Sequence, residues 1–209
     1  TYFGVIRVQP ISWGLLGPGL LVALSCGLAG GLFARLLTLS LSGQSSDRFT
    51  RWRQRYPVRF AAGCGLAVAL IGLASGGATF GSGYHHTRDL LAGEGESSGL
   101  YALLKFLATW ITAWSGAPGG IFAPSLAIGA GIGNNLAVLL AEEISSGTVL
   151  VLCTAGFLAA VTQAPITAFV IVMEMVSGYG IVIDLMIVAL LSSAVSRALC
   201  PPLYRTLAH

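Results

Sequence analysis

The stretch SGAPGGIFAPSLAIG, residues 115–129, decides how this sequence folds. Two groups of small residues surround the pair Ile121-Phe122, and an apolar segment with Pro124 near its start follows. Because proline is tolerated in the first turn of a helix, the pattern predicts a helix that begins near Phe122. The first amides of a helix have no intrahelical partner, and the helix dipole places partial positive charge beside them. We therefore expect the amides of Ile121 and Phe122 to bind an anion.

The two glycines before this helix, Gly119 and Gly120, are expected to let the backbone turn and approach the ion closely. No Lys or Arg occurs from Phe106 to Ala141, so the expected donors are neutral. Neutral donors suit a monovalent anion that must also leave the site, because conduction requires weak binding. On the residues alone, a glycine-rich junction between helices without any ligand is the alternative.

The composition indicates an integral, multi-pass membrane protein. Of 209 residues, 55% are hydrophobic and 9% are charged, and the mean hydropathy is +0.83. Soluble domains carry about 25% charged residues. The charges also leave long gaps, each long enough for a helix that crosses the hydrocarbon layer. No Asp, Glu, Lys or Arg occurs in residues 8–34, 60–87, 106–141 and 144–173. The net charge of +3 is too small to indicate nucleic-acid binding.

Many of the apolar segments are short and separated by Gly or Pro. We expect helices at Ile11–Leu39, Val58–Ala74, Tyr84–Leu91, Gly99–Trp114, Phe122–Glu142, Gly147–Thr162, Pro165–Val176 and Ile181–Leu199. A polar loop is expected at Ser42–Pro57, and Ser75–Gly83 is too rich in glycine for a helix interior. Irregular backbone at membrane depth is tolerated where it lines a cavity, and broken helices in transporters point their ends at the substrate. The pattern therefore predicts an ion or solute pathway.

Basic residues gather in one polar connection, which the positive-inside rule places in the cytoplasm. A solvated loop on either side is the alternative. The cluster contains Arg48, Arg51, Arg53, Arg55 and Arg59.

The cysteines lie singly in apolar surroundings, so we expect buried, unpaired thiols rather than a metal site. They are Cys26, Cys64, Cys153 and Cys200. The small residues around Gly27 to Gly31 are expected to let helices approach closely.

Several motifs in this order resemble the CLC family of chloride channels and transporters. Residues 120–124, GIFAP, match the GxFxP signature of that family, and residues 115–119 match its SGxPGG lead-in. Further similar segments are TFGSGY at 79–84, GFLAA at 156–160, APIT at 164–167, VMEM at 172–175 and PLY at 202–204. The resemblance extends from about Ile11 to His209.

The resemblance implies an all-α polytopic membrane fold of broken, tilted helices built from inverted repeats. It identifies residues 1–41 as the last helix of the first repeat, 58–199 as the second repeat and 201–209 as the start of the terminal helix. The chain is then the C-terminal half of a pore, completed by an N-terminal half of the same protein. The implied partners are chloride, protons in exchangers, the lipid bilayer and a second copy in a homodimer, in the inner or plasma membrane and without any cofactor.

The resemblance also implies which groups hold the ion. In the family, the amides of the residue pair at Ile121 and Phe122 bind the central chloride together with a tyrosine hydroxyl, here that of Tyr204. Gly119, Gly120, Ala123 and Pro124 support the motif. The family's GSGIP and GxEGP motifs do not occur in this sequence, and the serine role is not transferred to Ser82.

Because the gating glutamate belongs to the GxEGP motif, the sequence leaves channel and proton-coupled exchanger open. A non-conducting half-protein or assembly partner is one alternative, and a fluoride-selective member of the same family is another.

Other polar residues have structural interpretations. Glu174 is an acid in an apolar stretch, so it is a candidate for function, although a packing role near a helix end is also expected. Asp184 is expected at a helix start, and Lys105 is expected to snorkel or to pair with a helix end. His85 and His86 are interpreted as solvated loop-edge residues. Loop and helix-end charges are expected at Glu94, Glu96, Glu142 and Glu143. No pattern of catalytic or metal-binding residues appears, so we do not expect an enzyme.

Overall fold

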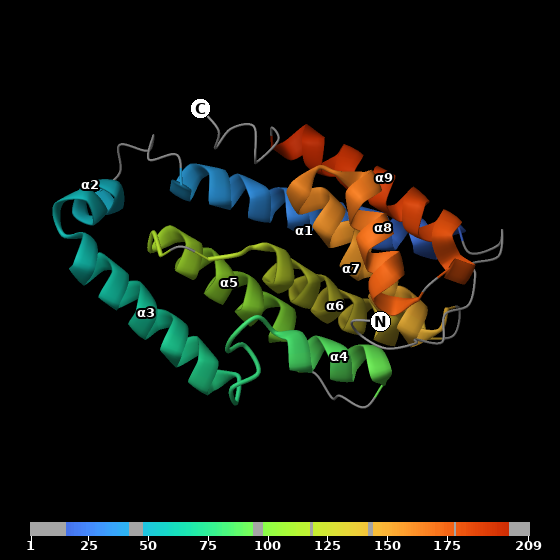
Figure 1. Cartoon of the computed structure of the whole chain (residues 1–209), viewed down its shortest axis with the longest axis horizontal. Coiled ribbons are helices and arrows are strands. Elements are labelled where there is room, and N and C mark those ends of the chain that lie inside the picture. The colour runs from blue at the N-terminus through green and yellow to red at the C-terminus, as the bar shows by residue number, and fades with distance from the viewer. Residues whose placement is uncertain are drawn as a thin grey trace.

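The computed structural model describes residues 16–41, 48–93, 98–117, 119–141, 144–177 and 179–200, and this part of the chain is helical (Figure 1). Its helices are α1 (Leu16–Leu41), α2 (Arg48–Arg55), α3 (Pro57–Ala74), α4 (Tyr84–Ala92), α5 (Tyr101–Trp114), α6 (Phe122–Leu139), α7 (Ser146–Thr162), α8 (Pro165–Val176) and α9 (Val182–Leu199), with a 3-10 turn η2 (Tyr179–Ile181) before α9.

The predicted helices occur between the Gly and Pro residues that separate the apolar segments. α8 has the predicted bounds, with Pro165 in its first turn, and α6 begins at the predicted Phe122. The prediction for α6 was too long at its other end, because the helix stops at Leu139. The glycine-rich junction at 75–83 forms turns, as expected. The first helix was expected to begin at Ile11, but the residues before position 16 lie outside the described ranges.

The prediction of a continuous loop at Ser42–Pro57 was wrong, because α2 occupies Arg48–Arg55. Arg and Gln are good helix formers, and tertiary contacts hold the short helix in place. The Arg53 guanidinium donates to the Ser40 carbonyl at 2.7 Å and to the Trp114 carbonyl at 3.3 Å. The Trp52 ring meets the Phe60 ring edge-on, with centroids 5.5 Å apart. Arg53 therefore links α2 to the ends of α1 and α5.

α7 is the centre of the molecule. Every residue from Thr148 to Val161 is buried, and the helix contacts α1, α6, α8 and α9. Figure 1 shows these helices gathered on one side of the molecule, with α3 along the opposite edge. A helix that is apolar on all sides has to be enclosed in this way.

Glycines allow the close approach of helices to α7. A Cβ on Gly30 of α1 would meet the Ala160 Cβ at 2.5 Å, and one on Gly133 of α6 would meet the Leu150 Cα at 2.7 Å. The expectation for the small residues of α1 is therefore confirmed. All four cysteines are free and buried, as expected, and the Cys26 thiol lies 3.6 Å from the Cys153 carbonyl.

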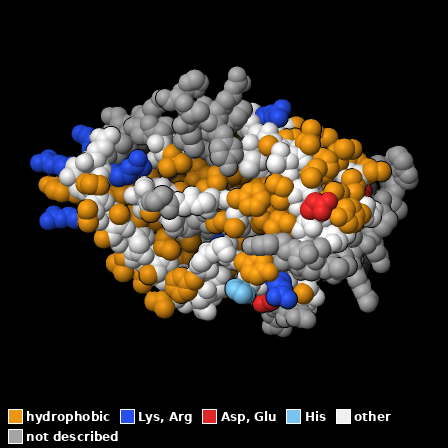
Figure 2. Space-filling model, in the orientation of Figure 1, with side chains coloured by type: hydrophobic (Ala, Val, Ile, Leu, Met, Phe, Trp, Pro, Cys, Tyr) orange, Lys and Arg blue, Asp and Glu red, His pale blue; other side chains and the backbone are white. Residues whose placement is uncertain are grey.

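Within the described ranges, four helical stretches are long and apolar enough to cross a membrane: 17–41, 57–74, 122–139 and 179–199. The outer face of α3 exposes Leu66, Leu70 and Leu73, which are 65%, 58% and 72% exposed. Figure 2 shows hydrophobic side chains over much of the described surface, while Lys and Arg gather at the left end, where α2 lies. Exposed apolar surface of this extent fits contact with lipid.

The close contact between α6 and α7 gives a prediction for stability. A Cβ on Gly129 would meet the Thr154 Cα at 2.8 Å and the Cys153 carbonyl oxygen at 2.9 Å, and neither backbone atom can move aside cheaply. We expect Gly129→Ala to cost about 1–3 kcal/mol by overpacking. The measurement is the melting temperature in detergent.

The matched control is Gly63→Ala in α3, where a Cβ would have nothing within 4 Å. Because alanine is the better helix former, this control should keep or raise the melting temperature. Equal melting temperatures for the two variants would contradict the packing described for Gly129.

Candidate anion-binding site

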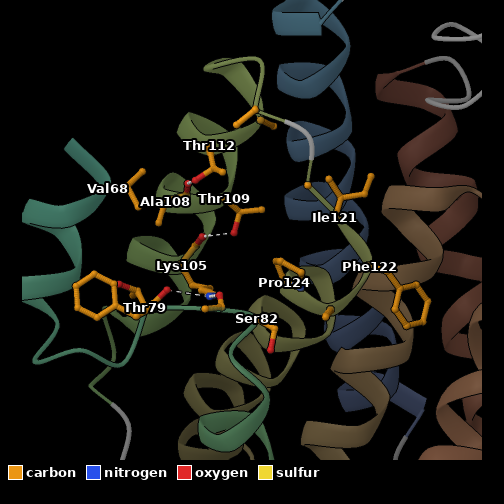
Figure 3. Close-up of a pocket in the computed structure, with 17 residues that line it drawn as sticks. Val68, Thr79, Ser82, Lys105, Ala108, Thr109, Thr112, Ile121, Phe122 and Pro124 are labelled. Atoms are coloured by element: carbon orange, nitrogen blue, oxygen red, sulfur yellow. Dashed lines mark hydrogen bonds between the residues drawn. The ribbon is translucent and has the colours of Figure 1, made fainter. Parts of the chain in front are cut away.

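A cavity of about 630 Å³ lies where the start of α6, the face of α5 that carries Lys105 and the junction after α3 meet (Figure 3). Residues 79–82 form one wall, and Thr109 and Thr112 of α5 belong to another. Residues 119–124 line the cavity as well, as do Val68 and Ala117. The predicted motif and two segments distant from it in sequence therefore line one cavity.

The start of α6 leaves backbone donors available to this cavity. Ile121, the residue before the helix, has φ −92° and ψ −12° and makes no side-chain cap. The Ser125 amide and hydroxyl both donate to the Ile121 carbonyl, at 3.0 and 2.6 Å. Among the described residues, none accepts a hydrogen bond from the amides of Ile121 or Phe122. These amides, with the positive end of the helix dipole behind them, can bind an anion.

The turn before α6 differs in detail from the sequence-based expectation. The left-handed backbone conformation occurs at Gly116, with φ 82°, whereas Gly119 and Gly120 do not have positive φ. A Cβ at Gly119 or Gly120 would have nothing within 4 Å, and both residues are exposed. These two glycines therefore keep space open in front of the amides, and Gly116 makes the turn.

Lys105 ties α5 to the junction that forms the opposite wall. Its ammonium donates to the Thr79 carbonyl at 2.9 Å and to the Gly81 carbonyl at 2.7 Å, and its side chain is 2% exposed. The expectation that Lys105 snorkels was wrong, because the buried carbonyls of the junction provide its hydrogen-bond partners. The sequence did carry one signal: Lys105 is the sole charged residue of α5, and isolated charges in apolar helices are functional candidates.

A hydrogen bond between two side chains of the junction also stabilises it. The hydroxyls of Ser75 and Thr79 lie 2.9 Å apart and form a hydrogen bond in which either can be the donor. Gly83 has φ 83°, and a Cβ there would meet the Ala127 Cβ of α6 at 2.7 Å. The junction thus rests directly on α6, one and a half turns beyond the helix start.

The structure brings most of the predicted motif to one place. Gly119, Gly120, Ile121, Phe122, Ala123 and Pro124 all line the cavity. Ser82 lines it too, and its hydroxyl accepts from the Tyr84 amide at 3.3 Å. Tyr204, the predicted hydroxyl donor, lies outside the described residues.

The other polar candidates lie away from this cavity. Glu174 on α8 is exposed and accepts a hydrogen bond from the Tyr179 hydroxyl at 3.1 Å. Asp184 lies in the first turn of α9, as expected. His85 is exposed, but His86 is half-buried, with its ring centroid 4.1 Å from that of Tyr101, so the expectation of a solvated side chain was wrong for His86. Glu94, Glu96, Glu142 and Glu143 lie outside the described ranges.

The described helices are apolar, and several are long enough to cross a membrane, so the class of protein is a multi-pass membrane protein. The particular family follows from comparison with known proteins. Residues 1–197 match the family described as "Voltage gated chloride channel", so the chain belongs to this CLC family.

The relatives found by sequence are described as voltage-gated ClC-type chloride channels, ClcB. The chain is 34% identical over 183 residues to ClcB of Salmonella typhi and 32% identical over 184 residues to ClcB of Escherichia coli O17:K52:H18. Each alignment covers 84% of this chain and 43% of the relative. The chain thus spans less than half the length of these relatives.

Solved structures show the same fold. A crystal structure of a CLC-type fluoride/proton antiporter matches with a TM-score of 0.82 at 21% identity, over 98% of this chain and 50% of the other. A crystal structure of a eukaryotic CLC transporter matches with a TM-score of 0.71 at 23% identity, over 94% of this chain and 35% of the other. The all-α CLC fold is therefore confirmed, while the division at 1–41, 58–199 and 201–209 stays a prediction.

The contact of the junction with α6 leads to a second prediction. Gly83→Ala and Gly81→Ala both place a Cβ at positive φ, which costs about 1–2 kcal/mol. We expect Gly83→Ala to lower the melting temperature more than Gly81→Ala does. The new Cβ at position 83 would also meet Ala127, whereas at Gly81 nothing lies within 4 Å. The pair is compared by thermal melting in detergent. An equal loss in both variants would show that the junction does not rest on α6 as described.

Proposed function

We propose that the full-length protein carries chloride across a membrane and that the cavity at the start of α6 binds the ion on its way. The observation that supports this most is the pair of amides of Ile121 and Phe122, which have no acceptor among the described residues, at the start of α6 in a chain of the CLC family. Transport by this protein, rather than catalysis, is the activity that such a site serves.

The chemistry of the site suits a weakly hydrated monovalent anion. Amides are neutral donors, and the helix dipole adds a partial positive charge of about half an elementary charge. The ion is therefore attracted without a bidentate cationic clamp, and it can leave again. We propose the Tyr204 hydroxyl as a third donor, on the basis of the family resemblance. We propose that Gly119 and Gly120 keep space open in front of the amides and that Ala123 and Pro124 support the motif.

The remainder of the pathway is proposed to come from an N-terminal half of the same protein, since the chain covers 43% of its ClcB relatives. We propose a homodimer in the inner or plasma membrane, with the arginine cluster around α2 on the cytoplasmic side. Whether protons move in exchange is the finer question. The ClcB relatives are described as channels, and one structural neighbour is described as a fluoride/proton antiporter.

Ion flux tests the proposal directly. The protein in its full natural length is reconstituted in liposomes loaded with chloride, and chloride efflux is recorded together with proton uptake. We expect chloride efflux, and proton uptake against a gradient would indicate an exchanger. Absence of anion flux from folded, dimeric protein would favour the non-conducting alternative, and flux of fluoride without chloride would favour the fluoride-selective one.

Removal of one backbone amide tests the ligand assignment. Replacing Phe122 by its α-hydroxy acid analogue exchanges the N–H for an ester oxygen and keeps the ring. A hydrogen bond to a charged partner contributes about 1.5–3 kcal/mol, so chloride should bind about tenfold more weakly or worse. Calorimetric titration with chloride measures this change.

Phe122→Ala is the matched control, because it keeps the amide and removes the ring. It should bind chloride more tightly than the ester variant. Unchanged chloride affinity in the ester variant would show that the Phe122 amide is not a ligand.

A further inference from the structure

The cavity contains a buried positive charge that the neutral-donor description leaves out. Lys105 is 2% exposed, and its side chain lines the same cavity as Ile121 and Phe122. Figure 3 shows it reaching from α5 toward the junction that carries Thr79 and Ser82, with Pro124 of α6 nearby. An isolated buried charge is costly unless something compensates it.

The described surroundings compensate this charge only in part. An ammonium has three N–H donors. The carbonyls of Thr79 and Gly81 accept hydrogen bonds from the Lys105 ammonium. The acidic residues within the described ranges are Asp89, Glu174 and Asp184, and none of them forms an ion pair with Lys105. Carbonyl dipoles lower the energy of the ammonium, but they do not neutralise its net charge.

The other side chains of this wall do not compensate the charge either. The Thr109 hydroxyl donates to the Lys105 carbonyl at 2.8 Å, and the Thr112 hydroxyl donates to the Ala108 carbonyl at 2.7 Å. These hydroxyls are engaged with the backbone of α5 itself. The positive end of α6 lies on the facing wall, so two positive features share one cavity.

We propose that Lys105 supplies the fixed positive charge of this cavity and that the bound anion is its counter-ion. This inference rests on the proposed function and deepens it. Lys105 acts through its charge rather than as a direct ligand, because the two carbonyls hold the ammonium against the junction. The same carbonyls weaken the field at the anion, so that binding remains reversible. A cation in the cavity would be repelled by both Lys105 and the α6 dipole.

A purely structural role makes a different prediction. If Lys105 only fastened the junction to α5, a neutral donor would serve equally well and would be cheaper to bury. Glutamine provides N–H donors for the carbonyls without a charge, and arginine keeps the charge with a different shape. Chloride affinity should therefore follow the charge at position 105 and not its capacity to donate hydrogen bonds.

The experiment compares Lys105→Arg, Lys105→Gln and Lys105→Met in the full-length protein. Chloride binding is measured by calorimetry and by the rise in melting temperature that chloride causes. We expect Lys105→Arg to stay within about threefold of the wild type, and both neutral variants to lose about tenfold or more, because they remove a unit charge from the lining of the cavity and with it the Coulomb attraction of the anion. Gly63→Ala in α3, outside the lining of the cavity, is the control and should leave affinity unchanged.

The outcomes separate the two proposals. If the wild type binds no chloride, the proposed function itself fails. If the wild type binds chloride and Lys105→Gln binds equally well, the charge role is overturned while the anion site stands. Loss of affinity in Lys105→Met but not in Lys105→Gln would likewise overturn the charge role, because that pattern indicates a structural hydrogen bond.

A second measurement covers the case in which the neutral variants do not fold. Lys105 is the single lysine of this sequence, and its ammonium resonance can be followed in wild-type protein with isotope-labelled lysine, assigned by its absence in Lys105→Arg. Chloride titration should shift that resonance with the same Kd as calorimetry. A resonance that does not respond to saturating chloride would overturn the proposal.

Discussion

The pairing of backbone polar groups in irregular segments among apolar helices is the constraint on which the rest of this structure depends. In a hydrocarbon layer an unpaired carbonyl or amide costs several kcal/mol, so irregular segments need specific partners. The junction at 75–83 obtains them from the Ser75 hydroxyl, which accepts from the Thr79 amide, and from Lys105, which donates to the carbonyls of Thr79 and Gly81. At the start of α6 the described residues supply no such partner for the amides of Ile121 and Phe122. An anion is the group that can satisfy these amides.

The helix packing makes this arrangement rigid enough to serve as a site. α7 is enclosed by α1, α6, α8 and α9, and the glycines at 30, 129 and 133 bring α1 and α6 to backbone contact with it. The position of the α6 start is therefore fixed by a core that contains none of the site's polar groups. Lys105 and Gly83 then fix the junction against α5 and α6. Sites built on helices held in this way keep their geometry better than sites on free loops.

Much of the fold follows from the sequence because Gly and Pro mark the helix ends. Pro165 and the run before Phe122 predicted two helix starts correctly, since both rest on local sterics. α2 was missed, because the contacts of Arg53 with Ser40 and Trp114 hold it, and these are long-range. Lys105 was misassigned for the same reason: its partners lie 26 and 24 residues away. The role of Tyr204 stays a prediction.

The buried lysine and the demand for weak binding are compatible once the carbonyls are considered. A free ammonium facing chloride in a low-dielectric cavity would hold the ion strongly, because the Coulomb energy rises as the effective dielectric constant falls. Two carbonyl oxygens at 2.7 and 2.9 Å place negative partial charge beside the ammonium and shorten the reach of its field. The junction thus serves two purposes with one set of bonds. It pairs its own carbonyls, and it weakens the field that the Lys105 ammonium exerts in the cavity. The proposed anion is then attracted from both sides of the cavity, by Lys105 and by the α6 dipole, and neither attraction is strong enough to retain it.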